Sequence, residues 1–197
     1  MKTLVLATNN KHKLREFKEM LEPIGYEVKT LKDFGITIDP EENGTTYGEN
    51  AYIKCKAARA LVDHPVISDD SGIEILGLNR FPGIHSSRYV DSECNGSYEE
   101  AFVDINKKLG NNPDRRAEYH CAICLLENLE DEPKIFEGVC PGYLLMEPNG
   151  IGGFGYDPLF HCTESDQDFG IATEDEKNAV SHRKKALVKL MEYLNNK

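Results

Sequence analysis

The chain has 197 residues, a formal net charge of -11 and 40% hydrophobic residues. This length and composition predict one globular domain that buries roughly 70% of the surface of the unfolded chain. The negative charge argues against a general nucleic-acid binder, which needs a basic surface to displace counterions. The negative charge is compatible with a small phosphorylated substrate, provided that local cations and a divalent metal hold the phosphates.

The N-terminal apolar run is too short for a signal peptide, and no stretch of about 18 apolar residues follows it, so we expect a cytoplasmic protein without a membrane partner. The six cysteines are scattered, and a chain of this size needs no disulfides, so we expect reduced thiols. Cys121 and Cys124 have CxxC spacing, but their alternating strand pattern points the two sulfurs to opposite faces.

The first predicted elements are a strand over residues 3–7 and a helix from Leu14 that ends before Pro23. The turn between them, residues 8–13, offers a hydroxyl, two amides and cations where a helix exposes unpaired N–H groups. This turn can bind an anion. The alternative is an ordinary Thr or Asn N-cap with solvated lysines.

A second strand is predicted over residues 26–30, then an irregular connection and a turn at 41–44. A helix over residues 45–63 follows, with its apolar side chains on one arc. Lys54 lies inside that arc. Because burying an ammonium group without a partner is costly, Lys54 either extends its amine to solvent or meets an anion.

Two short apolar runs then flank Asp69 and Asp70, which are followed by Ser71 and Gly72. This pattern predicts two carboxylates held at a turn between two strands, a place for metal-assisted chemistry. Beyond a Gly- and Pro-containing loop at 77–83, Ser97 and Glu100 predict a capping box for a helix that ends before Gly110. Strands are predicted over residues 117–125, 134–140 and 143–146, and their short connections imply a mixed sheet.

Residues 150–158 form a loop of four glycines that holds two aromatic side chains and an acid. Its flexible backbone and aromatic faces suit a flat ring better than a phosphate, although a turn anchored by core aromatics explains the pattern equally well. Thr173 and Glu176 predict another capping box. The basic run 181–185 starts a terminal helix, where it opposes the helix dipole. It therefore marks either an anion or polar-ligand site or a tolerated solvated run.

Four motifs occur in order: LATNNKHK at residues 6–13, SDDSG at 68–72, GFGYDP at 153–158 and SHR at 181–183. On these motifs the chain resembles, over nearly its whole length, the Ham1-like inosine triphosphate pyrophosphatases. The resemblance implies an α/β fold with an elongated mixed sheet, flanking helices and two lobes around a central substrate cleft, as a single domain over residues 1–197. It also implies hydrolysis of ITP, dITP and XTP to the monophosphate and pyrophosphate with Mg²⁺, and a homodimer.

The resemblance also assigns roles to individual residues. The phosphates would be held by Lys54 and by the first motif, namely Thr8, Asn9, Asn10, Lys11, His12 and Lys13. Glu42 and Asp70 would bind Mg²⁺, with Asp70 also activating water and Asp69 in support. Ser71 would contact substrate, and the base and sugar would be framed by Phe154, Gly155, Tyr156, Asp157, Lys177, His182 and Arg183. Tyr156 stands where some members of the family carry Trp.

Two alternatives remain open. A Maf-like pyrophosphatase acting on pyrimidine or modified nucleotides would share the architecture, but the Thr8-Asn9-Asn10 turn speaks against it. A non-catalytic module that binds purine nucleotides is the other. It would gain nothing from acids at positions 42, 69 and 70 without a metal.

Overall fold

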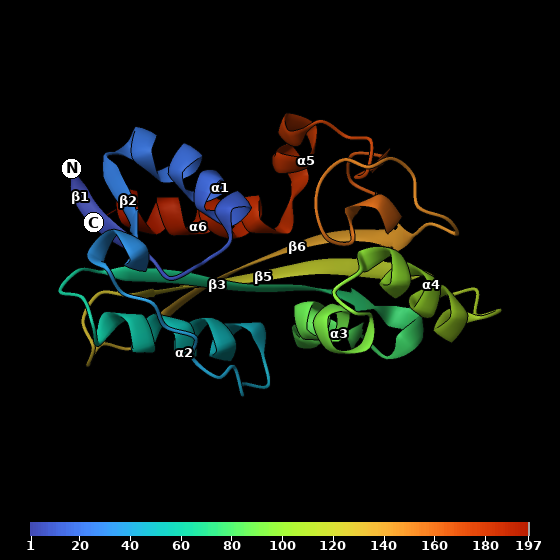
Figure 1. Ribbon diagram of the computed structural model, residues 1–197. Coiled ribbons are helices and arrows are strands. Elements are labelled where there is room, and N and C mark those ends of the chain that lie inside the picture. The colour runs from blue at the N-terminus through green and yellow to red at the C-terminus, as the bar shows by residue number, and fades with distance from the viewer. Residues whose placement is uncertain (197) are drawn as a thin grey trace. The chain divides into compact units, whose positions relative to one another are not determined.

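The computed structural model describes residues 1–196 (Figure 1). The chain divides into two compact units, which match the two predicted lobes in number. The first comprises Met1–Asp70, Cys121–Glu137 and the C-terminal residues from Lys185; the second comprises Ser71–His120 and Gly138–Lys184. One mixed sheet has the strand order β2-β1-β3-β5-β6-β7-β8, with β4 paired to β3. The long strands β3, β5 and β6 each contribute residues to both units.

The first unit is a parallel β-α-β arrangement extended by longer strands. Its pairs β1–β2 and β1–β3 are parallel. The elements wholly or largely within it are β1 (Lys2–Leu6), α1 (Lys11–Leu21), β2 (Tyr26–Thr30), α2 (Tyr47–Arg59) and α6 (His182–Asn195).

The first unit buries both faces of its part of the sheet. Side chains alternate along β1, so Leu4 and Leu6 join one apolar core with Phe17 of α1 and Leu190 of α6. Val5 and its same-face neighbours join another core against α2. Figure 1 accordingly shows α1 and α6 over one face of these strands and α2 over the other.

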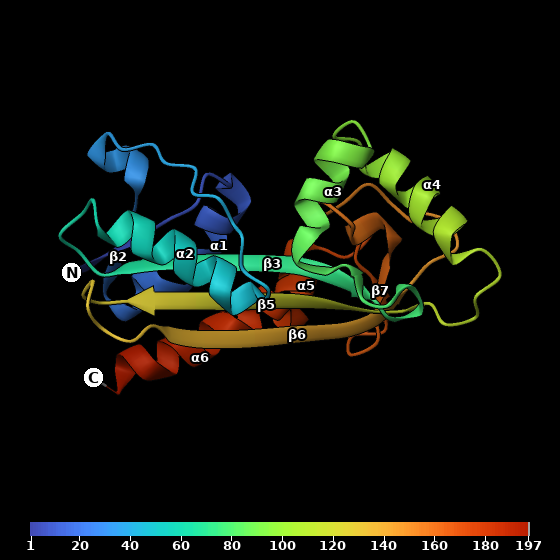
Figure 2. The same ribbon diagram turned by 90° about the horizontal axis from the view of Figure 1, so that it is seen from below.

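The second unit has one apolar core, which helices and strands share. Helices α3 and α4 lie side by side (Figure 2). β6–β7 and β7–β8 pair antiparallel, as does β3–β4. Its remaining elements, together with the strands shared by both units, are β3 (Val66–Ile75), β4 (Phe81–Pro82), α3 (Ser86–Glu93), α4 (Tyr98–Leu109), β5 (Arg116–Leu126), β6 (Lys134–Leu144), β7 (Phe160–Cys162), β8 (Gln167–Asp168) and α5 (Glu174–Val180).

The predicted turn at Asp69-Asp70 is wrong, because β3 runs without interruption from Val66 to Ile75. The strand tolerates its polar residues because each has a partner nearby. Ser68 Oγ, for example, donates to the Ala51 carbonyl at 2.5 Å. The predicted break within residues 134–146 is also wrong. Pro141 lies inside β6, and its carbonyl accepts from the Thr163 N–H at 3.2 Å. The strand therefore lacks only the backbone N–H that proline does not have.

Helix ends follow the capping predictions in most places. Thr173 and Glu176 form the predicted box at the start of α5. Ser97 caps α4 as predicted, but the Glu100 carboxylate accepts from Asn95 at 2.8 Å, because the Ser97 N–H already donates to the Cys94 carbonyl. The second helix is shorter than predicted: Thr46 is its N-cap, so α2 starts at Tyr47. Helix α3 was not predicted, since its short run of residues shows no clear helical pattern.

All six cysteines are free thiols, as predicted. Cys121 and Cys124 lie in the two different cores of the first unit, so the CxxC spacing does not bring the sulfurs to one face. Within residues 1–196, no helix combines the length and the apolar character needed to cross a bilayer.

Candidate active site

Asp69 and Asp70 point to opposite faces of β3, because adjacent residues of a strand alternate. Asp69 meets α1: its Oδ2 lies 2.8 Å from Lys13 Nζ, and both side chains are largely buried. Asp70 meets α2, where Asn50 Nδ2 donates to its Oδ2 at 3.2 Å. The two acids are therefore held separately, each by a different helix.

Lys54 of α2 bridges the two carboxylates that the resemblance assigns to the metal. Its Nζ lies 3.0 Å from Glu42 Oε1 and 3.6 Å from Asp70 Oδ1. Burial alone would lower the pKa of Lys54, but the charges of Asp70, Asp69 and Glu42 outweigh it and raise that pKa. Of the two sequence-based readings, an amine extended to solvent or one that meets an anion, the structure supports the second.

This acidic cluster, defined as Glu42, Asp69 and Asp70 with Lys13 and Lys54, carries three carboxylates against two ammonium groups. Burial raises the pKa of Asp70 above its ordinary value; Lys54 opposes this shift and Glu42 adds to it. Carboxylate oxygens are the ligands that Mg²⁺ prefers. Glu42 and Asp70 therefore fit the predicted metal.

The predicted turn over residues 8–13 is too long, because Asn10 is the N-cap and α1 already starts at Lys11. The residues before the helix are held by their own side chains. Asn10 is the N-cap: its Oδ1 accepts from the backbone N–H groups of His12 at 2.9 Å and Lys13 at 3.3 Å. Thr8 Oγ1 accepts from the Asn10 N–H at 3.2 Å. Asn9, Asn10, Lys11 and His12 are exposed, and Thr8 and Lys13 are half-buried. The N-cap alternative describes Asn10 correctly, while Lys13 is an ion-pair partner rather than a solvated lysine.

A second cluster, in the other unit, is organised around Asp157. Its Oδ2 accepts from the Phe154 N–H at 2.8 Å and from Lys177 Nζ, and its Oδ1 accepts from the Tyr119 hydroxyl at 3.0 Å. Gly153 has a φ of +70°, and a Cβ there would run into the Asp157 carboxylate. The loop therefore wraps around this acid, which the backbone and two side chains hold in place.

The two aromatic residues of the loop differ in environment. Tyr156 is buried, donates its hydroxyl to the Ser86 carbonyl at 2.8 Å, and packs edge-on against Tyr98. Phe154 is half-buried, and Lys177 Nζ lies 4.3 Å from the centre of its ring. Phe154 is thus the more exposed aromatic of this pair and lies beside Lys177, while Tyr156 serves the core.

The last motif lies at the start of α6, where the predicted basic run indeed opens the helix. Arg183 is buried, and its Nη2 donates to Ser71 Oγ at 3.1 Å. The His182 ring stacks on Tyr119, with centroids 4.8 Å apart and planes at 11°. The structure thus brings Ser71, His182 and Arg183 together with the Asp157 cluster in the second unit. Gly155, with a φ of +66°, completes the loop.

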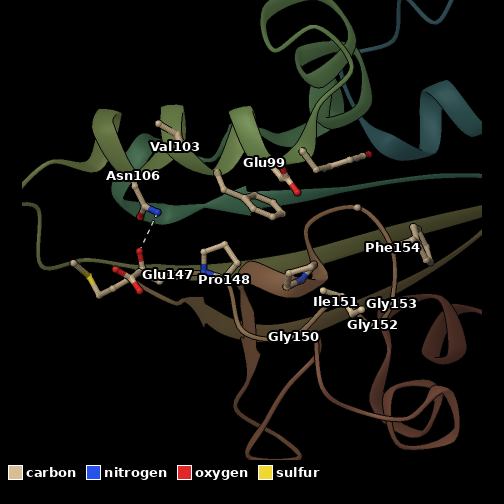
Figure 3. A pocket seen from close by; sticks show the side chains of 15 residues that line it. Glu99, Val103, Asn106, Glu147, Pro148, Gly150, Ile151, Gly152, Gly153 and Phe154 are labelled. Carbon is tan, nitrogen blue, oxygen red and sulfur yellow. Dashed lines mark hydrogen bonds between the residues drawn. The ribbon is translucent and has the colours of Figure 1, made fainter.

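The same loop borders a largely apolar pocket of about 770 Å³ on α4 (Figure 3). Figure 3 shows Gly150 to Gly153 facing Glu99 and Val103 across it. Phe154 and Gly155 also line this pocket. Three of its lining side chains are exposed apolar residues, namely Val103, Met146 and Ile151.

Sequence reasoning missed two residues that contact the assigned groups, Asn50 and Tyr119. Both lie in a helix or a strand, at buried positions for which the periodic pattern predicts a core residue. A buried polar side chain needs a hydrogen-bond partner, and this requirement could have indicated that both residues contact another polar group. The partner's identity, Asp70 or Asp157, depends on the tertiary structure.

The sequence profile of the Ham1 family matches residues 4–193. The chain belongs to the Ham1 family. It is 40% identical to a protein of Halalkalibacterium halodurans named dITP/XTP pyrophosphatase, over 98% of this chain and 100% of that protein. A protein of Bacillus subtilis with the same name is 41% identical, over 98% of each chain.

Solved structures agree with this family assignment. A HAM1 protein from Coxiella burnetii aligns over 100% of both chains with a TM-score of 0.93 and 38% identity. The Staphylococcus aureus Ham1 protein aligns over 99% of both chains with a TM-score of 0.89 and 36% identity. The resemblance and the mixed α/β fold predicted from the four motifs are confirmed. The two clusters around Asp70 and Asp157 belong to a Ham1-family chain.

Proposed function

We propose that this Ham1-family chain hydrolyses non-canonical purine nucleoside triphosphates, ITP, dITP and XTP, to the monophosphate and pyrophosphate. The observation that carries the proposal is the acidic cluster, where a buried carboxylate with a raised pKa stands beside a second acid and a lysine. Relatives that align over the full length and are named dITP/XTP pyrophosphatase support the same activity. The Maf-like alternative has no comparable support.

In this proposal the acidic cluster handles the phosphates and the water. Mg²⁺, held by Glu42 and Asp70, would neutralise phosphate charge and polarise phosphorus. Asp70 takes the proton of the attacking water, since a raised pKa brings its basicity nearer to the working pH. Asp69 keeps Lys13 in place. Lys54, Lys13 and the other residues of the segment 8–13 supply the cations and N–H groups for the phosphates.

The Asp157 cluster would recognise the base. Phe154 offers a ring face, and stacking on an aromatic ring is worth about 1–3 kcal/mol without distinguishing bases. Lys177 and Arg183 are donors, which suit the O6 and N7 acceptors of hypoxanthine and xanthine, whereas adenine presents an amino donor at position 6. Selectivity follows because a mismatched base leaves buried polar groups unpaired. A homodimer and a cytoplasmic location remain predictions.

The substrate prediction is tested by measuring pyrophosphate release from ITP, XTP, GTP, ATP and UTP with Mg²⁺. We expect kcat/KM for ITP and XTP to exceed that for ATP and UTP by about a hundredfold or more, since unpaired polar groups reject the wrong base strongly. Equal turnover of all five would contradict the base selectivity. Calorimetric binding of ITP without turnover would instead support a non-catalytic nucleotide-binding module.

The metal prediction is tested with Glu42→Gln. Removing one carboxylate oxygen from the site should raise the Mg²⁺ concentration needed for half-maximal rate about tenfold or more, with activity recovered at high Mg²⁺. Glu41→Gln is the matched control, because that side chain is its exposed neighbour and has no assigned role. Chelation with EDTA should abolish pyrophosphate release in all three proteins. An unchanged Mg²⁺ titration of Glu42→Gln would remove Glu42 from the metal site.

A further inference from the structure

Tyr119 of β5 contacts two of the residues assigned to the base, although it lies in none of the four motifs. Its hydroxyl donates to Asp157 Oδ1 at 3.0 Å, and its ring stacks on His182 with planes at 11°. The ring is buried, with Phe160 and Phe169 within 4.6 and 6.2 Å between centroids. Tyr119 therefore connects the 153–158 loop to the start of α6.

Three of the roughly four acceptor sites of the Asp157 carboxylate are already used by groups of the protein. One of its oxygens accepts from Tyr119, and the other accepts from the Phe154 N–H and Lys177. Two donors on one oxygen and one on the other fix the plane of the carboxylate. Lys177 in turn lies over the Phe154 ring, at 4.3 Å from its centre. The orientation of Asp157 thus determines where the Lys177 ammonium lies.

We propose that Tyr119 is a positioning residue for purine recognition: its hydroxyl fixes Asp157, and through Asp157 it fixes Lys177 above Phe154. This inference rests on the proposed function, because it deepens the role of the same base-recognising cluster. Burial and the charge of Asp157 raise the pKa of Tyr119 well above its ordinary value, so the hydroxyl stays a donor at any working pH. An ammonium group held in one place donates to an oxo group and is opposed by an amino group, whereas a mobile one can move away from the amino group and discriminates less.

The test is Tyr119→Phe, which removes the hydroxyl and keeps the ring that stacks on His182. We expect KM for ITP to rise about tenfold with kcat within about twofold, because the contact acts on binding of the base and not on the bond that breaks. The preference for ITP over ATP in kcat/KM should fall by a similar factor.

Tyr89→Phe is the matched control. Tyr89 is also buried and donates to a carboxylate, Asp104, at 2.6 Å, and that carboxylate is likewise bound by a lysine, Lys108. Both variants lose one Tyr-to-Asp hydrogen bond, and Tyr119→Phe should lower Tm more, because the Asp157 side chain is 3% exposed and that of Asp104 is 35% exposed. A merely structural role for Tyr119 predicts that KM and base preference stay unchanged in both variants, and that result would overturn the proposal.

A binding measurement separates this proposal from the proposed function. Calorimetry with IMP, the product of ITP hydrolysis, needs no turnover. If the wild-type chain releases no pyrophosphate from any of the five nucleotides, the proposed function fails. Weaker IMP binding by Tyr119→Phe, but not by Tyr89→Phe, would still support the positioning role. Equal IMP affinity of Tyr119→Phe and wild type would refute it.

Discussion

Asp70→Asn should lower kcat/KM for pyrophosphate release from ITP about a thousandfold. The substitution keeps the size of the side chain and an oxygen to accept from Asn50, but an amide cannot take a proton from water. Loss of a general base typically costs a factor of about 10²–10⁴. The measurement is a steady-state assay at saturating Mg²⁺, so that weaker metal binding does not contribute.

The same variant should be more stable than the wild type when no divalent metal is present. The folded-state pKa of Asp70 lies above its ordinary value of 3.8, chiefly because the group is buried. The stability that such a group contributes is fully present below the unfolded pKa and is lost as the pH rises through the folded pKa. Near pH 7 the carboxylate is therefore destabilising, and an uncharged amide removes that cost.

Thermal unfolding with EDTA checks this expectation. We expect Tm of Asp70→Asn to exceed that of the wild type near pH 7, and the difference to shrink towards pH 4. Asp63→Asn is the control, because the Asp63 side chain is fully exposed and should change neither Tm nor activity appreciably. A lower Tm for Asp70→Asn, or an unaffected rate, would contradict the role assigned to Asp70.

The sequence predicted elements whose formation is decided locally. The strand over 26–30 has the predicted bounds, and the first helix ends before Pro23, as expected. The prediction of a turn at Asp69-Asp70 was wrong because two consecutive charged residues interrupt the apolar pattern that is typical of a strand. In the fold, each of these acids meets a lysine from a different helix, Lys13 or Lys54, and no local pattern reports such partners.

Site residues were easiest to predict where a polar or charged residue stands among positions that the pattern assigns to apolar residues. Lys54 in an apolar arc predicted either an amine extended to solvent or one that meets an anion, and the structure places Glu42 and Asp70 beside it. Tyr119 did not contradict its surroundings, since an aromatic residue in an alternating strand is ordinary core. Its hydroxyl partner, Asp157, follows β6 in the chain and depends on how the 153–158 loop folds back.

Lys177→Met should lower the free energy of unfolding by about 3–5 kcal/mol, because it leaves a charge buried without its counter-ion. The Lys177 and Asp157 side chains are only 8% and 3% exposed. The Asp157 carboxylate would keep the Tyr119 hydroxyl and the Phe154 N–H, which are neutral donors. Urea unfolding of wild type and variant, with m-values compared, measures the loss.

A double variant and a matched single variant separate ion-pair loss from loss of packing. In Lys177→Met with Asp157→Asn no charge is stranded, so a substantial part of the loss should be recovered. Lys108→Met breaks the similar pair with Asp104, but those side chains are 39% and 35% exposed, and an exposed pair is worth about 0–1 kcal/mol. If Lys177→Met lowers the free energy of unfolding no more than Lys108→Met does, the ion pair between Lys177 and Asp157 is not desolvated. Lys177 would then be free to leave Asp157 for a ligand, and the positioning role of Tyr119 would lose its physical basis.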